Sequence, residues 1–174
     1  MKKSFLIILT AVIPVSGYGQ KLKSGSFDGI FSEGRINVKI DYSKAMINGY
    51  TEEELLDSEI EMGKDWKNGK PEVNQKFIFA LNEKAGKNVS IGSYKNTKYT
   101  IVYYPLTIDK DGDQKAYATV VDENGETILE TAEFKASGGH IGTFMNLVGD
   151  GMDSAGERLG YVFRSAYYAS KKKK

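Results

Sequence analysis

The sequence has no cysteine and only one histidine, and each scarcity excludes a class of chemistry. Without cysteine, the chain forms no disulfide framework, thiol nucleophile, thiolate zinc site, iron–sulfur cluster or cysteine-anchored lipid. A single imidazole is too few for the common multi-histidine metal sites. The charges nearly cancel, with 24 Lys and Arg against 23 Asp and Glu, so the net charge does not favour a nucleic-acid partner. We expect no cofactor and no nucleic acid.

The remaining composition is that of a folded protein. The chain has 174 residues, of which 40% are hydrophobic and 11% aromatic, which is enough for one globular domain with a sizeable core. No internal repeat and no low-complexity linker divides it. We therefore predict a single domain over residues 20–174.

Residues 1–19 have the pattern of a signal peptide. Lys2 and Lys3 precede an apolar stretch over residues 5–15, and Gly17 and Gly19 are small residues spaced like a cleavage site before Gln20. The apolar stretch is about half the length that spans a bilayer, and no later run of ~20 apolar residues exists. We expect a periplasmic or secreted protein without an integral membrane segment after cleavage.

The first half of the expected domain is predicted to contain one strand and two helices. Residues 20–34 are an extended lead-in, and strict apolar alternation over residues 35–42 indicates a half-buried strand. Thr51 and Glu54 have the spacing of a capping box, which begins a helix from about residue 52 to 67. Residues 68–70 are expected to break it, with Pro71 starting a second helix that ends at Gly86.

The second half is predicted to be a meander followed by a helix. Strands are expected over residues 89–94, 98–108, 115–122 and 127–135, with a hairpin at 123–125 and Pro105 marking an edge strand or a bulge. A helical stripe then runs over residues 144–166, with a break near 149–151, and residues 170–174 form a basic tail. The order strand, helix, helix, strands, helix predicts an α+β fold, in which an antiparallel sheet of three to five strands has helices on one face.

Three aspartates form the only candidate metal site. Asp109, Asp111 and Asp113 alternate in a turn, at a spacing that surrounds calcium in helix–loop–helix sites. Such a loop has Gly at its sixth position and Glu at its twelfth, where this chain has Gln114 and Val120. We favour a charged hairpin turn over a metal site.

The residue types of a hydrolase triad occur near the C-terminus. His140 and Ser154, with Asp150 or Asp153, supply them, but the glycines of a nucleophile elbow do not flank the serine. We predict no catalytic residue. A pair of carboxylates for glycoside cleavage stays open, because the separation of two acids is a property of the fold.

Tyrosines are dense in the predicted strands. Tyr94, Tyr99, Tyr103 and Tyr104, with Tyr117 on the next strand, are able to line a face that binds a sugar or an apolar ligand. Strand propensity and sheet-face packing explain the same tyrosines without a ligand, and we favour that explanation. The candidate ligand-binding residues are Tyr99, Tyr103, Tyr117 and His140.

Several fragments resemble known bacterial proteins. A helix at residues 77–84, the Tyr-Thr-Ile strand at 99–101, the hairpin at 122–126 and a small-residue helix at 155–161 resemble the small α/β domains of the Tol-system periplasmic protein and of curli-secretion-type lipoproteins. The export signal followed by Gln20 resembles small exported proteins of Bacteroidetes-type bacteria. The resemblance implies a role in assembly or interaction without catalysis. The chain departs from the lipoproteins because it has no cysteine for a lipid anchor.

The expected function is therefore that of an exported, non-enzymatic domain of the bacterial envelope. Its partner is a protein, a small molecule or a glycan, bound through the sheet face or the glycine-rich C-terminal region. One alternative is a carboxylate-dependent glycan hydrolase, which needs two buried acids roughly 5 to 9 Å apart in a cleft. The other is a carrier of lipid or small molecules, which needs a closed apolar cavity.

Overall fold

The computed structural model describes residues 22–172, so the predicted signal peptide, residues 1–19, lies outside the described residues. The fold is α+β and combines one mixed sheet with three α-helices. The strands are β1 (Leu22–Gly25), β2 (Arg35–Ile40), β3 (Met46–Ile47), β4 (Tyr50–Thr51), β5 (Ser90–Gly92), β6 (Tyr99–Ile108), β7 (Gln114–Asp122), β8 (Thr127–Thr131) and β9 (Phe134–Ala136). The helices are α1 (Glu52–Asp57), α2 (Glu61–Ala85) and α3 (Phe144–Lys172), with a short 3-10 turn, η1, at Ile30–Ser32.

The sheet is mixed, so the prediction of a purely antiparallel sheet is wrong. The strand order is β1-β8-β7-β6-β2-β5, and β2 runs parallel to both of its neighbours, β5 and β6. The meander β6-β7-β8 is antiparallel, as expected. The chain passes through α2 between β2 and β5, and a strand that returns after a helical crossover pairs in parallel.

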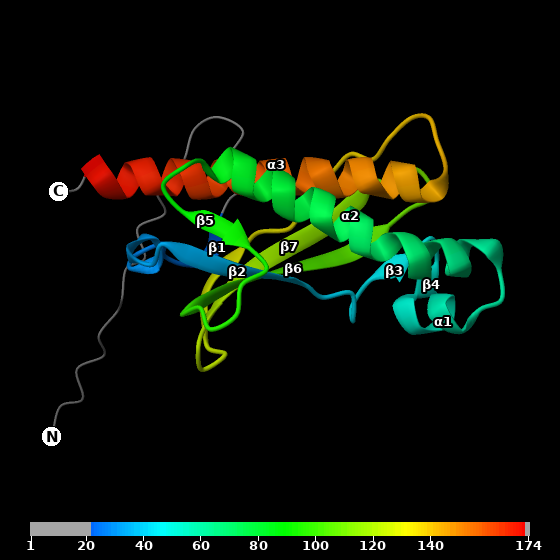
Figure 1. Ribbon diagram of the computed structural model, residues 1–174, viewed down its shortest axis with the longest axis horizontal. Coiled ribbons are helices and arrows are strands. Elements are labelled where there is room, and N and C mark those ends of the chain that lie inside the picture. Colours follow the sequence, from blue (N-terminus) through cyan, green and yellow to red (C-terminus); the bar gives the residue numbers. More distant parts are fainter. Residues whose placement is uncertain (1–21, 173–174) are drawn as a thin grey trace, which may run out of the picture.

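The two long helices lie side by side on one side of the sheet (Figure 1). They run in the same direction, since Gly69 early in α2 faces Met145 at the start of α3, and Lys84 at the end of α2 faces Gly160, about the middle of α3. A Cβ atom added at Gly160 would lie 2.6 Å from the Lys84 Cβ. The absence of a side chain there lets the two backbones approach closely.

The predicted break at residues 68–70 does not exist. The helix that starts at the Thr51 cap ends at Asp57, and α2 continues through Gly69 and Pro71. Trp66, Val73 and Phe77 are all buried and lie on one stripe that spans the expected break. Their burial stabilises a continuous helix, and tertiary packing thereby overrides the low helix propensity of Gly and Pro.

The predicted break at 149–151 is also absent, because α3 is one helix from Phe144 to Lys172. Val148, Met152, Ala155 and Leu159 are buried on one side of it. This continuous apolar stripe offsets the roughly 1 kcal/mol that each interior glycine costs relative to alanine. The helix also includes Lys171 and Lys172, which were expected in a basic tail.

Two smaller features differ from expectation, and a third agrees with it. The lead-in forms β1, which pairs with β8, and the turn η1, whose Ile30 is fully buried. The strand expected over 127–135 divides into β8 and β9. Pro105 lies in β6, and the prediction of an edge strand or a bulge there is confirmed by the bulge, since the register with β7 shifts between Pro105 and Thr107. On the other side of β6, β2 pairs only up to Tyr103 and β3 only from Thr107, so neither strand pairs at Pro105.

Within residues 22–172, no helix combines the length and the apolar character that crossing a bilayer requires.

Candidate functional site

The strand β6 divides the predicted tyrosines between the two faces of the sheet. Tyr103 faces the helices, where its ring stacks on Phe77 with centroids 4.4 Å apart. Tyr104 points the other way and stacks on Tyr117 of β7, with centroids 4.8 Å apart and planes 14° from parallel. Since side chains alternate along a strand, Tyr99 lies on the helix side with Tyr103. The structure therefore does not bring Tyr99, Tyr103 and Tyr117 together.

The tyrosines on the helix side belong to the core. Tyr103 is 0% exposed, and its hydroxyl donates a hydrogen bond to the Gln114 Oε1 at 2.8 Å. Burial raises the pKa of this hydroxyl far above its ordinary value, so it stays a donor. Tyr99 is also buried, with the Lys98 ammonium 5.5 Å from its ring centroid. Both residues belong to the hydrophobic core and leave little surface for a ligand.

The opposite side of the sheet, which carries Thr100, Val102, Tyr104 and Tyr117 and which we call the open face, has a different chemistry. Lys44 lies in the turn after β2, and its ammonium donates to the Tyr117 hydroxyl at 2.9 Å. The same ammonium lies 4.9 Å from the centroid of the Tyr104 ring. The hydrogen bond that Lys44 donates to Tyr117 raises the pKa of Lys44, which keeps this cation charged. Lys44 was not among the predicted site residues, because no sequence pattern links it to β7.

A wide hollow of about 740 Å³ continues the open face beyond the tyrosine pair. Val102 lies in its floor, two residues before Tyr104 on the same side of β6. Thr119 lies between Tyr117 and Val121, and its hydroxyl is buried without a hydrogen-bond partner among the described residues. The lining residues are Glu33, Lys39, Asn96, Thr97, Lys98, Thr100, Val102, Val121, Asp122, Glu123 and Gly125.

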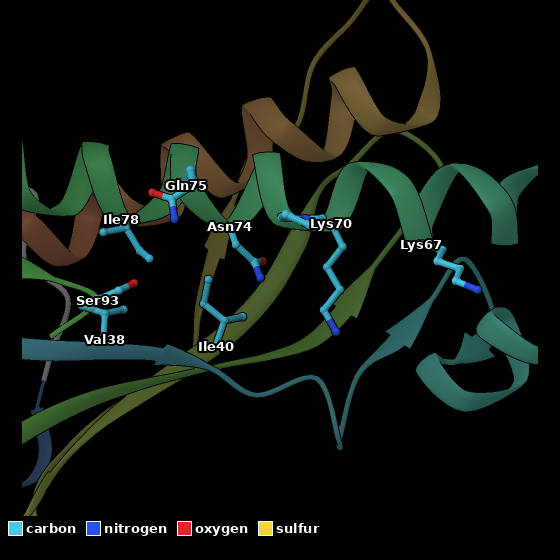
Figure 2. A pocket seen from close by; sticks show the side chains of 9 residues that line it. Val38, Ile40, Lys67, Lys70, Asn74, Gln75, Ile78 and Ser93 are labelled. Atoms are coloured by element: carbon cyan, nitrogen blue, oxygen red, sulfur yellow. The ribbon is translucent and has the colours of Figure 1, made fainter. Parts of the chain in front are cut away.

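A second hollow, of about 370 Å³, lies between β2 and α2, and Figure 2 shows its lining side chains. We call it the edge groove. Val38 and Ile40 enter it from β2, and Ile78 and polar side chains enter it from α2 (Figure 2). Its lining residues are Val38, Ile40, Lys67, Lys70, Pro71, Asn74, Gln75, Ile78 and Ser93. Sequence patterns did not indicate it, because the two elements meet only in the tertiary structure.

The residues of the possible triad do not form a catalytic cluster. His140 lies in an exposed loop before α3, next to Ile141, which is 92% exposed. Ser154 lies within α3, and neither side chain has a hydrogen-bond or ion-pair partner among the described residues. The buried polar side chains of residues 22–172 are Gln114, Thr119 and Thr131, so no acid there is buried as a glycan hydrolase of the predicted kind requires.

Two of the three aspartates of the 109–113 turn accept hydrogen bonds from the backbone. The Asp109 Oδ1 accepts from the amides of Asp111 and Asp113, each at 3.0 Å. Asp113 accepts from the Gly138 amide at 2.7 Å, and Asp111 pairs with Lys110. In residues 22–172 no group of three or more His, Asp or Glu side chains gathers as a metal centre would require. The arrangement is that of a hairpin turn fastened to the loop before α3.

Comparisons with known proteins add little to this description. No protein-family model and no curated protein matches the chain. Among solved structures, the PelC dodecamer from Paraburkholderia phytofirmans is similar over 74% of this chain and 88% of that one, with 8% identity and a TM-score of 0.39. A variant of the same dodecamer matches 74% and 87% of the two chains, with 10% identity and a TM-score of 0.37. Likeness at this level supports no statement about function.

Proposed function

We propose that this protein is an exported, non-catalytic binding domain of the bacterial envelope and that its open face binds a hydroxyl-rich ligand, a glycan. The proposal depends chiefly on one observation, the stacked pair of Tyr104 and Tyr117 with Lys44 beside it, on the side of the sheet that α2 and α3 leave free. Export is inferred from the pattern of residues 1–19 alone.

The aromatic pair suits the apolar side of a sugar ring. Tyrosine combines an apolar ring with a polar hydroxyl, and this combination recurs where a ligand is partly apolar and partly wet. Lys44 holds the Tyr117 hydroxyl in place and offers further N–H donors of its own. A sugar that packs on the outer face of one of the two stacked rings would therefore meet an apolar surface with a hydrogen-bonding group at its border.

The adjoining hollow supplies polar groups of both kinds. Lys39 and Lys98 provide donors, and Glu33, Asp122 and Glu123 provide acceptors. Because cations and anions are mixed, a neutral polar ligand fits this surface better than a polyanion.

Binding is tested by NMR titration of the protein with a panel of soluble neutral oligosaccharides, followed through the backbone amide shifts. We expect shifts confined to residues of the open face, and Tyr104→Ala to raise the dissociation constant about tenfold, equivalent to about 1.4 kcal/mol. Tyr168→Ala is the matched control, since Tyr168 is 50% exposed and belongs to α3. A panel that leaves the open face unshifted would contradict the proposal.

Absence of catalysis is tested separately. The protein is incubated with each oligosaccharide that binds, and the products are analysed by chromatography. We expect the sugars to be recovered intact. Turnover that is lost on replacing His140 or a single acidic residue would show that the protein is an enzyme.

A further inference from the structure

The strand β2 has a free edge where it lines the edge groove. β5 pairs with β2 only from Arg35 to Asn37 and ends at Gly92. β2 continues to Ile40, and over Val38–Ile40 its only strand partner among the described residues is β6, on the other side. An unpaired strand edge presents amides and carbonyls that pair readily with another extended chain.

The direction of the backbone groups along β2 follows from two hydrogen bonds. The Asp41 amide donates to the Tyr103 carbonyl on the β6 side at 2.9 Å, whereas the Gly34 carbonyl accepts from the Ser90 amide on the β5 side at 3.1 Å. Backbone groups of successive residues alternate between the two sides of a strand. The amide of Ile40 therefore points to the free side, where no strand of the described chain meets it.

The groove beside this edge has an apolar floor and a fixed polar side chain. Val38, Ile40 and Ile78 supply the apolar surface (Figure 2). The Tyr42 hydroxyl donates to the Asn74 Oδ1 at 2.6 Å, which fixes the carboxamide and leaves its NH2 group available as a donor. An extended chain on the edge would direct one side chain into the groove and the next one away from it.

The only charges that line the groove are positive. Lys70 is held by Glu52 at 2.6 Å and lies 5.0 Å from the centroid of the Tyr42 ring. Lys67 is exposed and has no acidic partner within the described part of the chain. A ligand with a carboxylate near Lys67 is complementary to this end of the groove.

We propose that the edge groove binds an extended acidic peptide segment of a partner protein, which adds to the free edge of β2 as a short strand where β5 ends. The peptide backbone pairs with Val38–Ile40, one apolar side chain packs on the groove floor, and a neighbouring carboxylate lies near Lys67. Peptide recognition by strand addition takes its affinity from the main chain and its specificity from such side-chain positions. This site is separate from the open face, so either proposal can fail alone.

The test uses the full chain and a fluorescent peptide of alternating Glu and Val, with fluorescence anisotropy for affinity and hydrogen exchange for the mode of binding. We expect saturable binding and slower exchange of the Ile40 amide, with the already bonded Asp41 amide unchanged. Lys67→Glu is expected to weaken binding about tenfold. Lys87→Glu is the matched control, because Lys87 is an exposed lysine that does not line the groove.

A second peptide separates strand addition from charge attraction. This second peptide has the same sequence, but alternate backbone nitrogens are methylated. It keeps the charges and loses the hydrogen bonds along one edge of its backbone, and we expect it not to bind. Equal binding of both peptides would overturn the proposal in favour of simple charge attraction. Displacement of the peptide by millimolar inorganic phosphate would overturn the proposal in favour of a small anion. The protein is also measured without peptide: if the Ile40 amide then exchanges slowly in a dimer that forms as the protein concentration rises, the edge binds a second copy of this chain and the proposal is overturned.

Discussion

Tyr103 and Tyr104 are neighbours in β6, and they lie in very different surroundings on opposite faces of the sheet. Tyr103 is fully buried against Phe77, with its hydroxyl bonded to Gln114. Tyr104 is half-buried on the open face, where it contacts Tyr117 and the cation of Lys44. Successive side chains of a strand point to opposite faces of the sheet, and α2 and α3 cover only one of these faces (Figure 1). The face to which a tyrosine points therefore decides whether it stabilises the fold or is available to a ligand.

The largest expected difference follows replacement of each tyrosine by alanine. Tyr103→Ala removes a buried ring and is expected to lower the free energy of unfolding by about 3–5 kcal/mol. Tyr104→Ala loses chiefly the contact with Tyr117, and about 1 kcal/mol is expected. Urea denaturation followed by circular dichroism measures both. Equal losses for the two variants would contradict the division between a core side and an open side.

A methyl group placed between the long helices tests how closely the covered side is packed. A Cβ at Gly156 would overlap the Phe77 carbonyl oxygen and lie 3.0 Å from the Ala80 Cβ. Gly156→Ala is therefore expected to cost about 1–3 kcal/mol, although alanine favours an isolated helix. Gly34→Ala is the matched control, since nothing lies within 4 Å of its added Cβ. Thermal or urea unfolding that places Gly156→Ala at or above the wild type would contradict this packing.

Alkaline pH tests the burial of the Tyr103 hydroxyl. In the native protein burial raises the pKa of this group, so it retains its proton where the unfolded chain, with an ordinary tyrosine pKa of 10.0, releases it. Stability should therefore fall as the pH rises above 10, by about 1.4 kcal/mol per pH unit for this group. Buried Tyr42, whose pKa is raised by the same cause, adds to the slope.

The variant Tyr103→Phe isolates that contribution. At pH 7 it is expected to be about 1 kcal/mol less stable than the wild type, because Gln114 loses its donor. Above pH 10 the difference should shrink, since the variant has one buried hydroxyl fewer. Tyr104→Phe, on the open face, serves as the comparison. Parallel stability curves for Tyr103→Phe and the wild type would show that the hydroxyl is not buried as described.

The smallest effect concerns the solvent side of the helix layer. Partial burial and the nearby Glu157 charge raise the pKa of Asp153, so its ionised form is disfavoured in the native state. Asp153→Asn is expected to raise the stability by roughly a few tenths of a kcal/mol at pH 7. The gain should disappear as the pH falls below the ordinary aspartate value of 3.8, where the unfolded chain is also protonated. A constant gain across this range would exclude titration as its cause.

The glycine cluster near the C-terminus was the feature for which sequence reasoning gave the least specific answer. The glycines of residues 149–160 predict a weakened helix, broken near 149–151, whose small residues let it lie close to a sheet. In the structure Gly156 and Gly160 lie against α2, and Gly151 lies against the carbonyl of Gly112 in the β6–β7 turn. The glycines are sites of close backbone approach, and no single-chain pattern shows which backbone will approach.

The candidate sites were predictable only in part. The density of tyrosines identified β6 and β7, and Tyr117 does lie on the open face. The sequence did not indicate Lys44, which reaches Tyr117 from the turn after β2. It also did not indicate the edge groove, because the free edge exists only where β5 ends before β2 does.

The sequence by itself determined the local features whose residues lie within a few positions of one another. The alternation of residues 35–42 produced β2, the Thr51 and Glu54 side chains form both hydrogen bonds of the predicted capping box, and the hairpin at 123–125 joins β7 to β8. Only the tertiary structure decided that β2 pairs in parallel, that α2 and α3 pass unbroken through Pro71 and Gly149, and which face of the sheet the helices cover. These outcomes depend on apolar burial between residues distant in sequence, and that burial outweighs local preferences of about 1–3 kcal/mol.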